Sequence, residues 1–415
     1  MTELARNPHQ GIMGIYRRFG PVCTLGVGPL RYTYMLGPEA NRFVLANSQL
    51  FRWREAFQSL MAVDGENALI VSDGEQHQRL RRLVTPAFGQ RRIRDYAATM
   101  RRHADAAIDS WRPGQVIDLY QQLGRVIRRS TIEILFGARL AADEPELGRL
   151  LEDALKVAHR QPPWQQLQRL GSPAWRRAIA GREVVAQRII TEIEHRRREP
   201  DVDGHDVLSA LVAARDDDNS RLTDTEIVDQ VISLIAAGYE TTSAASAWAA
   251  YELLAEPDRW KQAREDSTDG TWRYLDGVVS ETLRLHPPGA VIPRRAATAF
   301  DFHDTHVAAS STIVISPYVT HRLPELWEDP LRFEPLRWDP NRPGHRKPAL
   351  HEYLPFGGGP HRCVGAVFAT TELAVLLERV LARTELDLDT VDLRPVSLAM
   401  MRPQRGPFAT VRTVE

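Results

Sequence analysis

A cysteine placed between a glycine-rich turn and a helix is the feature of this chain best suited to chemistry. Residues 356–365 read Phe-Gly-Gly-Gly-Pro-His-Arg-Cys-Val-Gly and contain Cys363, one of only two cysteines in 415 residues. Three glycines and a proline allow a tight turn that larger side chains would obstruct. Apolar residues then recur at helical spacing, at Leu373, Leu376, Leu377, Val380 and Leu381. We therefore expect Cys363 to lie just ahead of a helix.

The surroundings of Cys363 favour a thiolate, which is the form of cysteine that binds metal. The first N–H groups of a helix have no partner within the helix, and they stabilise a nearby negative charge. His361 and Arg362 add positive charge beside the sulfur. A soft, anionic sulfur suits iron, so Cys363 is a candidate metal ligand.

Two other interpretations of the cysteine loop compete with metal binding. A lone cysteine is more commonly a buried structural residue. A glycine-rich loop that leads into a helix can also bind phosphate, but the Gly-Lys-Ser/Thr ending of such loops is absent here. The other cysteine, Cys23, lies in an apolar stretch typical of a strand, and we expect it to be an ordinary core residue.

The cysteine loop resembles the haem-binding loop of the cytochromes P450, of the soluble bacterial type. The matching positions are Phe356, Gly359, His361, Cys363 and Gly365. The resemblance implies that these residues bind haem b, with Cys363 as the thiolate ligand of iron and His361 near a haem propionate. It also implies a mainly α fold with small β-sheets, a single large domain over residues 1–415 around one buried haem.

Composition agrees with one large enzyme-sized domain. Hydrophobic residues make up 43% of the chain, enough for a large core, and no linker divides it. The 53 basic and 54 acidic residues nearly cancel, which argues against a nucleic-acid-binding protein. Residues 1–14 lack an apolar core of signal-peptide length, and no apolar run is long enough to span a bilayer. We expect a soluble, cytoplasmic protein without a membrane anchor.

Several elements can be predicted from local patterns. Alternation predicts strands within residues 16–36, around a turn at Gly28-Pro29, and a strand at residues 312–315. Residues 57–71 form a looser apolar stretch that is long enough to be a functional loop. Residues 117–198 are a series of amphipathic helices, with breaks at residues 161–163 and 171–173.

A long central helix carries polar residues in an apolar setting. Thr223-x-x-Glu226 is a capping box, and the helix that it opens is apolar nearly all round to about Ala255. At about 1.5 Å per residue, this helix spans roughly 45 Å. Residues 238–242, Gly-Tyr-Glu-Thr-Thr, interrupt its apolar character at a cost in stability unless they are used. A structural explanation stays open, since threonine can bond to a preceding carbonyl and glycine can ease packing.

The same stretch resembles the oxygen-activation motif of the cytochromes P450. The match runs through Ala237, Gly238, Glu240, Thr241 and Thr242. By this resemblance Thr241 donates a hydrogen bond to bound dioxygen and Glu240 relays protons from water. Gly238 would leave space for the ligand of the iron.

Basic residues at two places are candidate partners of the haem propionates. His77 and Arg81 stand four apart and share one helix face, where they can bind an anion, although a solvated basic helix would look the same. The resemblance assigns both to a propionate. It assigns a further propionate contact to Arg294, with Arg295 as the alternative.

A charged triad is expected to stabilise the fold. Glu281-x-x-Arg284 alone is weak, because ion pairs at this spacing are common on exposed helices. With Arg337, in the sequence Phe-x-Pro-x-Arg-Trp that begins at Phe333, it resembles the buried charge network of the family. The resemblance gives these three residues a structural role.

The resemblance implies a monooxygenase that inserts one oxygen atom of O2 into an apolar organic substrate, by hydroxylation or epoxidation, in secondary or lipid metabolism. Apolar residues expected at the substrate, together with Gly238, are Phe57, Leu60, Met61, Leu69, Leu234, Ala237, Val291, Ile292 and Met400. A haem sensor or electron carrier would not need Glu240 and Thr241. A peroxide-driven oxygenase on the same fold would tend to lack that pair.

The chain has no flavin or iron–sulfur segment, so electrons are expected from a ferredoxin and a ferredoxin reductase. Residues 75–105 contain eight arginines against three acids. In a helix of about 3.6 residues per turn, Arg82 points away from the face of His77 and Arg81. We therefore expect Arg82 to face the surface, where it could meet an acidic donor.

Overall fold

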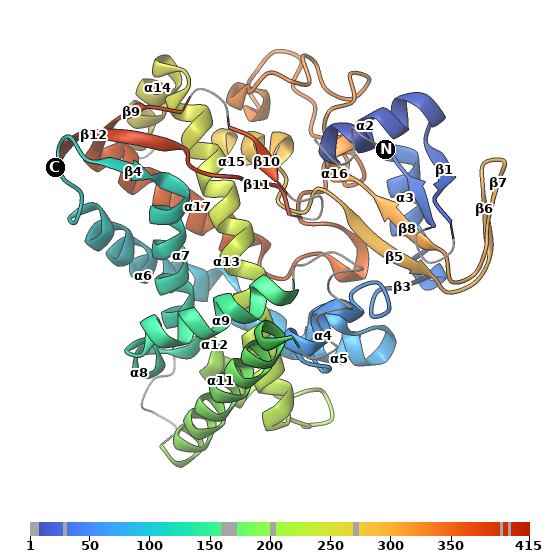
Figure 1. Cartoon of the computed structure of the whole chain (residues 1–415), viewed down its shortest axis with the longest axis horizontal. Coiled ribbons are helices and arrows are strands. Elements are labelled where there is room, and N and C mark those ends of the chain that lie inside the picture. Colours follow the sequence, from blue (N-terminus) through green and yellow to red (C-terminus); the bar gives the residue numbers. More distant parts are fainter. Residues whose placement is uncertain are drawn as a thin grey trace. The chain divides into compact units, whose positions relative to one another are not determined.

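The computed structural model describes residues 8–27, 31–158, 172–199, 205–268, 274–390, 393–396 and 400–415. The chain divides into two compact units. The first unit comprises Met1–Arg52, Met100–Val126 and Thr241–Glu415, and the second comprises Trp53–Thr99 and Ile127–Glu240. Helices predominate in both (Figure 1). No described helix combines the length and apolar character that crossing a membrane requires.

A five-stranded sheet organises one part of the first unit. Its spatial order is β1 (Val22–Leu25), β2 (Tyr32–Met35), β8 (Thr312–Ile315), β5 (Ile292–Ala296) and β3 (Phe51–Arg52). Neighbouring strands are antiparallel except β2 and β8. Helix α2 (Pro8–Phe19) lies beside this sheet (Figure 1) and buries Ile12 and Ile15 in the same apolar cluster as Tyr34.

The amino-terminal strand prediction is partly wrong. Strands β1 and β2 are confirmed, but residues 16–19 end helix α2 instead of beginning a strand. Buried residues at positions 9, 12, 13 and 15 follow the helical period rather than alternation, and this amphipathic pattern outweighs the local strand signal. The expected turn at Gly28-Pro29 lies outside the described residues.

Helices form the rest of the core of the first unit. Helices α14 (Pro257–Thr268), α15 (Tyr274–Leu285) and α17 (Ala366–Arg383) share one apolar cluster, which contains Leu253, Leu283 and Leu377. A three-stranded sheet has the order β4 (Val116–Asp118), β12 (Phe408–Val414) and β9 (Thr384–Leu388). Short elements complete the unit: α3 (Pro38–Ala46), β6 (Phe300–Phe302), β7 (Thr305–Val307), α16 (Pro317–Thr320), η6 (Pro335–Trp338), β10 (Pro395–Val396) and β11 (Arg402–Pro403).

Helix α13 (Asp224–Leu254) confirms the predicted long helix. Its capping box is reciprocal: the Thr223 N–H donates to Glu226 Oε2 at 2.8 Å, and the Glu226 N–H donates to Thr223 Oγ1 at 3.2 Å. The helix begins in the second unit and ends in the first.

The second unit is built of helices around a segment of short turns. The short elements are η3 (Gln58–Leu60), α4 (Met61–Asp64), η4 (Leu69–Val71) and η5 (Thr85–Phe88). The helices are α5 (Gly74–Val84), α8 (Ala138–Ala141), α9 (Glu144–Ala158), α11 (Pro173–Arg198) and α12 (Val207–Ala213). Two more helices, α6 (Gln90–Ile108) and α7 (Leu119–Phe136), have residues in both units. Ser172 caps α11 by accepting from the Trp175 N–H at 3.2 Å, at the predicted break. The break predicted at residues 161–163 lies outside the described residues.

Candidate functional site

The cysteine loop is held by its backbone and requires its glycines. The Cys363 N–H donates to the Phe356 carbonyl at 2.9 Å, which closes the loop. Gly357 and Gly359 have φ values of +65° and +66°, a conformation that side chains disfavour. A Cβ atom at Gly358 would lie 2.9 Å from two methyl carbons of Leu45. Larger residues at positions 357–359 would therefore disturb the loop conformation. Leu45 packs against the loop, a contact that sequence reasoning missed.

Cys363 is exposed and lies just before helix α17, as predicted. Gly365 is the N-cap of that helix and no side chain caps it, so its first N–H groups favour an anion at this end. An exposed position contradicts the interpretation of Cys363 as a buried structural residue. Cys23 differs: it is partly buried in β1 against an apolar cluster, and burial raises the pKa of its thiol.

The centre of helix α13, residues 237–241, is at least partly exposed although it lies within an apolar stretch. We call these residues its open centre. From Ile227 to Ala250 every residue is buried except Leu234 and residues 237–241. Those residues include Gly238, Glu240 and Thr241. A Cβ atom at Gly238 would meet only a methyl group of Thr131, at 3.9 Å, which is an ordinary contact. Close packing therefore does not explain this glycine.

Helix α5 places the predicted propionate residues of the second unit on one face. His77 is buried and Arg81 is partly buried. Arg82 faces the surface as expected, but it forms a bidentate ion pair with Asp216. Its Nε donates to Oδ1 at 2.9 Å and its Nη2 donates to Oδ2 at 3.0 Å. Arg79 likewise bonds Glu226 at 2.7 Å. The basic character of this helix is thus largely offset by neighbouring acids.

Strand β5 distinguishes the two candidate arginines of the first unit. Arg294 is buried, and its Nη1 donates to the Pro293 carbonyl at 2.8 Å. Arg295 is partly exposed and donates to Thr312 Oγ1 of the neighbouring strand at 2.8 Å. Since successive side chains of a strand point to opposite faces, only one of them can face a common ligand.

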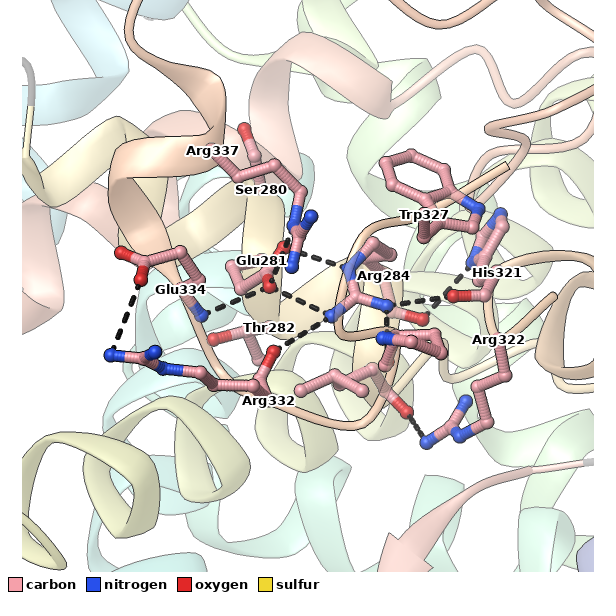
Figure 2. Close-up of polar contacts among 12 residues, drawn as sticks. Ser280, Glu281, Thr282, Arg284, His321, Arg322, Trp327, Arg332, Glu334 and Arg337 are labelled. Carbon is pink, nitrogen blue, oxygen red and sulfur yellow. Dashed lines mark hydrogen bonds and ion pairs between the residues drawn. The ribbon is translucent and has the colours of Figure 1, made fainter. Parts of the chain in front are cut away.

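The structure brings Glu281, Arg284 and Arg337 together, as Figure 2 shows. Arg284 and Glu281 are 0% exposed and share two hydrogen bonds of 2.7 and 2.8 Å. The carboxylate also accepts from the Trp338 indole N–H at 2.9 Å, from the Glu334 N–H at 3.0 Å and from Arg337 Nε at 3.3 Å.

Arg284 links the irregular segments that surround helix α15. It donates to the carbonyls of His321 and Pro330 at 2.7 Å and to that of Arg332 at 3.0 Å. Burial and the nearby Arg284 hold the pKa of His321 well below its ordinary value, so this ring stays neutral beside the cluster. The cluster ties α15 to the segment that leads into the cysteine loop.

The apolar residues expected at the substrate are divided between the units. Phe57, Leu60, Met61, Leu69, Leu234 and Ala237 belong to the second unit, and Val291, Ile292 and Met400 belong to the first. Met400 pairs with Gly289 in an isolated β-bridge. All nine except Leu69 are at least partly exposed, so their apolar surface is not consumed by the core.

Sequence reasoning also missed the residues that hold the loop of Leu60, Met61 and Leu69. They are Asn67, Arg182, Asp229 and Gln230. The adjacent polar residues Asp229 and Gln230 in an apolar helix were the available signal, because buried polar groups require partners.

The donor groups fit a haem better than a bare metal ion. In the part of the chain that the structure describes, no group of three or more His, Cys, Asp or Glu side chains could hold a metal ion. An iron in a porphyrin needs only one axial side chain from the protein, and a thiolate can serve. Within the first unit, Cys363 can supply that thiolate, and Arg294 and His361 offer cationic or hydrogen-bonding groups for carboxylates. Within the second unit, His77 and Arg81 offer groups of the same kind.

Comparisons with known proteins point in the same direction. A family model described as cytochrome P450 matches residues 1–408. The chain is 45% identical to cytochrome P450 139 of Mycobacterium tuberculosis, over 97% of both chains. It is 32% identical to pentalenene oxygenase of Streptomyces avermitilis, over 93% of this chain and 89% of the relative. The solved structure of retinoic acid bound cyanobacterial CYP120A1 has the same fold, with a TM-score of 0.87, 24% identity and coverage of 97% and 93%.

Proposed function

Because the chain belongs to the cytochrome P450 family, it is a haem b monooxygenase, and we propose that Cys363 is the thiolate ligand of its haem iron. The observation that carries this assignment is the exposed sulfur of Cys363, fixed by a glycine loop at the uncapped start of helix α17. When bound, haem activates O2 so that one oxygen atom enters the substrate.

The propionates of the haem are proposed to bind His77, Arg81, Arg294 and His361, within a single domain over residues 1–415. Burial of the Arg294 guanidinium supports Arg294 over Arg295, whose side chain is bonded along the sheet. Phe356, Gly359 and Gly365 would shape the loop around the cofactor. In this scheme Glu281, Arg284 and Arg337 bind no ligand and keep the loop's surroundings rigid.

Glu240 and Thr241 are proposed to manage protons. The Thr241 hydroxyl can both accept and donate a hydrogen bond, and the Glu240 carboxylate can exchange protons with water. Both lie in the open centre of helix α13, where water and a small ligand can approach. Gly238 beside them keeps side-chain atoms away from this position.

The proposed substrate is an apolar cyclic hydrocarbon of the terpene kind, oxidised in secondary metabolism. The name of pentalenene oxygenase, a relative over most of both chains, supports this class. The partly exposed apolar residues Leu60, Met61, Leu234, Val291 and Ile292 would contact such a skeleton without polar recognition.

A monooxygenase of this family takes its electrons from a redox partner. We propose that the partner is a ferredoxin with its reductase and that the enzyme acts in the cytoplasm. Fractionation of cells that express the chain tests its location.

The cysteine assignment is tested by two matched substitutions. The ferrous carbonyl form of the wild type is expected to show the strongly red-shifted absorption of thiolate-bound haem. Cys363→Ser is expected to lose this absorption, whereas Cys23→Ser should keep it because Cys23 belongs to strand β1. Loss of the band in Cys23→Ser alone would reject the assignment.

A further inference from the structure

Residues 53–73, which we call the clasped loop, are held by side chains rather than by a sheet. The Asp73 carboxylate accepts from the Trp53 N–H at 3.0 Å and from the Arg54 N–H at 2.8 Å, which closes the loop at its ends. Arg54 Nη1 donates to the carbonyls of Glu66 and Val71 at 2.8 and 3.2 Å. The loop is thus tied across its width.

Helix α13 binds the middle of the clasped loop through two adjacent buried residues. Asp229 Oδ2 accepts from the backbone N–H and the side-chain amide of Asn67, at 3.1 and 2.9 Å. Gln230 accepts from the Leu69 N–H at 2.8 Å and donates to the Asn67 carbonyl at 2.6 Å. These side chains replace the backbone partners that a strand would have provided.

Arg182 of helix α11 completes the arrangement. Its Nη2 donates to Asp229 Oδ1 at 2.5 Å and its Nε donates to the Val63 carbonyl at 2.8 Å. One guanidinium therefore binds the helix residue that holds the loop and the loop itself. The Asp229 side chain is 4% exposed, so loss of Arg182 would leave a buried carboxylate without its counter-charge.

Gly65 shows that the loop and the carboxylate are matched in shape. Its φ is +95°, and a Cβ atom there would lie 2.0 Å from Cγ of Asp229. Any side chain at position 65 must displace the loop or the carboxylate. The loop also buries the apolar side chains of Val63, Ala68, Leu69 and Val71, so polar contacts and apolar burial hold it together.

We propose that Arg182, Asp229 and Gly65 are positioning residues that fix the clasped loop and thereby set access to an apolar substrate. Polar contacts to α11 and α13 hold the loop, and Leu60 packs partly against the small cluster under α4. Leu60 and Met61 both keep some exposed apolar surface that can contact a substrate. The inference rests on the proposed function, because it assigns these side chains to the substrate chamber.

Amide hydrogen exchange tests whether these side chains hold the clasped loop in place, and this measurement does not depend on a signal from the cofactor. Arg182→Ala is expected to speed exchange of the Asn67 and Leu69 amides at least about tenfold, since removing one partner of a buried pair costs several times the 1.4 kcal/mol that a factor of ten represents. Gly65→Ala is expected to speed the same exchange at least about tenfold, because the added Cβ atom must displace the loop or the Asp229 carboxylate. Arg182→Lys keeps the charge opposite Asp229, so its exchange rates at these amides should lie between those of the wild type and Arg182→Ala. Arg188→Ala is the matched control, because Arg188 lies on the same helix and pairs with the exposed Asp143 and Glu146.

Ligand kinetics test the functional part of the proposal. Binding of 4-phenylimidazole and of cyanide to the ferric holoenzyme is followed by stopped-flow absorbance. We expect both variants to bind and release the bulky 4-phenylimidazole several-fold faster, with cyanide kinetics unchanged, and the Arg188→Ala control to match the wild type.

Each result decides the proposal. Unchanged exchange at Asn67 and Leu69 would overturn the clasp. Faster exchange with unchanged 4-phenylimidazole kinetics would show that these contacts stabilise the loop without affecting access, which would also overturn the inference. Absence of a haem spectrum in the wild type would reject the proposed function itself. If Arg182→Ala does not fold, Gly65→Ala and Arg182→Lys supply both readouts.

Discussion

Thr241 and Thr242 illustrate how two neighbouring hydroxyls can have different uses. Thr242 is buried among the packed residues of helix α13, whereas Thr241 is partly exposed in its open centre. A buried threonine can satisfy its hydroxyl within the helix. We propose that the partly exposed Thr241 is the one that takes part in proton transfer.

Thr241→Ala should therefore separate electron consumption from product formation. We expect this variant to keep its haem and to consume reductant, while the yield of product per electron pair falls at least about tenfold, in line with the usual contribution of a proton-transfer group. The electrons should appear as hydrogen peroxide. Thr242→Ala is the control and should keep its coupling. Equal product yields in the wild type and Thr241→Ala would remove Thr241 from the proton path.

The buried His9 should make the free energy of unfolding depend on pH. It is 1% exposed, neither ring nitrogen has a hydrogen-bond partner among the described residues, and its ring lies 5.2 Å from that of Tyr318. Burial, followed by the charges of Arg322 and His286, lowers its pKa to about 4. The unfolded chain therefore binds a proton at His9 near pH 6.5, whereas the folded protein does so only near pH 4.

Above pH 6.5, His9 should not make the free energy of unfolding depend on pH. Below pH 6.5, this free energy should decrease as the pH falls. One extra proton bound by the unfolded state gives a slope of about 1.4 kcal/mol per pH unit between pH 6.5 and 4. Burial also lowers the pKa of His286, which steepens the loss. His9→Phe, measured by urea unfolding at pH 7 and 5, should flatten the slope by about one proton. An unchanged slope would contradict the burial of a neutral His9.

At the scale of elements, sequence patterns predicted what is local and missed what is distant. The capping box of Thr223 and Glu226 fixed the start of α13 because both residues belong to one turn. The clasped loop gave no such signal, since its partners Asp229 and Gln230 are more than 160 residues away. Arg82 was placed correctly on the surface from helix geometry, but its partner Asp216 could not be predicted without the fold.

The proposed site follows the same rule. The position of Cys363 ahead of a helix could be predicted because its loop, its basic neighbours and its helix are contiguous. The proposal of Arg294 over Arg295 draws on the neighbouring strand, in which Thr312 accepts a hydrogen bond from Arg295. Alternation also misjudged residues 16–19, where burial along one face of α2 decides the structure.

Helix α15 depends on its buried charge pair. Arg284→Ala would leave the fully buried Glu281 without its principal counter-charge, a loss of about 3–5 kcal/mol. We expect little folded, haem-loaded protein and a clearly lower Tm. Arg332→Ala is the control, because Arg332 is exposed and its pair with Glu334 is long at 3.6 Å, so its Tm should change little. A stable, haem-replete Arg284→Ala protein would contradict the network.

At the scale of the whole molecule, surface charge bears on how a redox partner is met. The formal net charge is −1, so attraction of the acidic ferredoxin that we propose as partner must come from a local excess of positive charge. The arginines of α5 contribute less than their number suggests, because Arg79 and Arg82 are paired with Glu226 and Asp216. On the next helix, Arg91 and Arg94 are exposed and have no acidic partner within the described part of the chain.

We therefore expect Arg91 and Arg94, rather than Arg82, to attract the partner. Exposed charges act mainly on the encounter rate, and salt screens them over a Debye length of about 8 Å at physiological ionic strength. Reduction by a ferredoxin, followed by stopped-flow absorbance, should slow as salt rises. The double change Arg91→Gln and Arg94→Gln should slow it further at low salt and leave the haem bound, whereas Arg82→Gln should have a smaller effect because Asp216 already offsets that charge. Rates that are indifferent to salt and to the double change would remove this surface from partner docking.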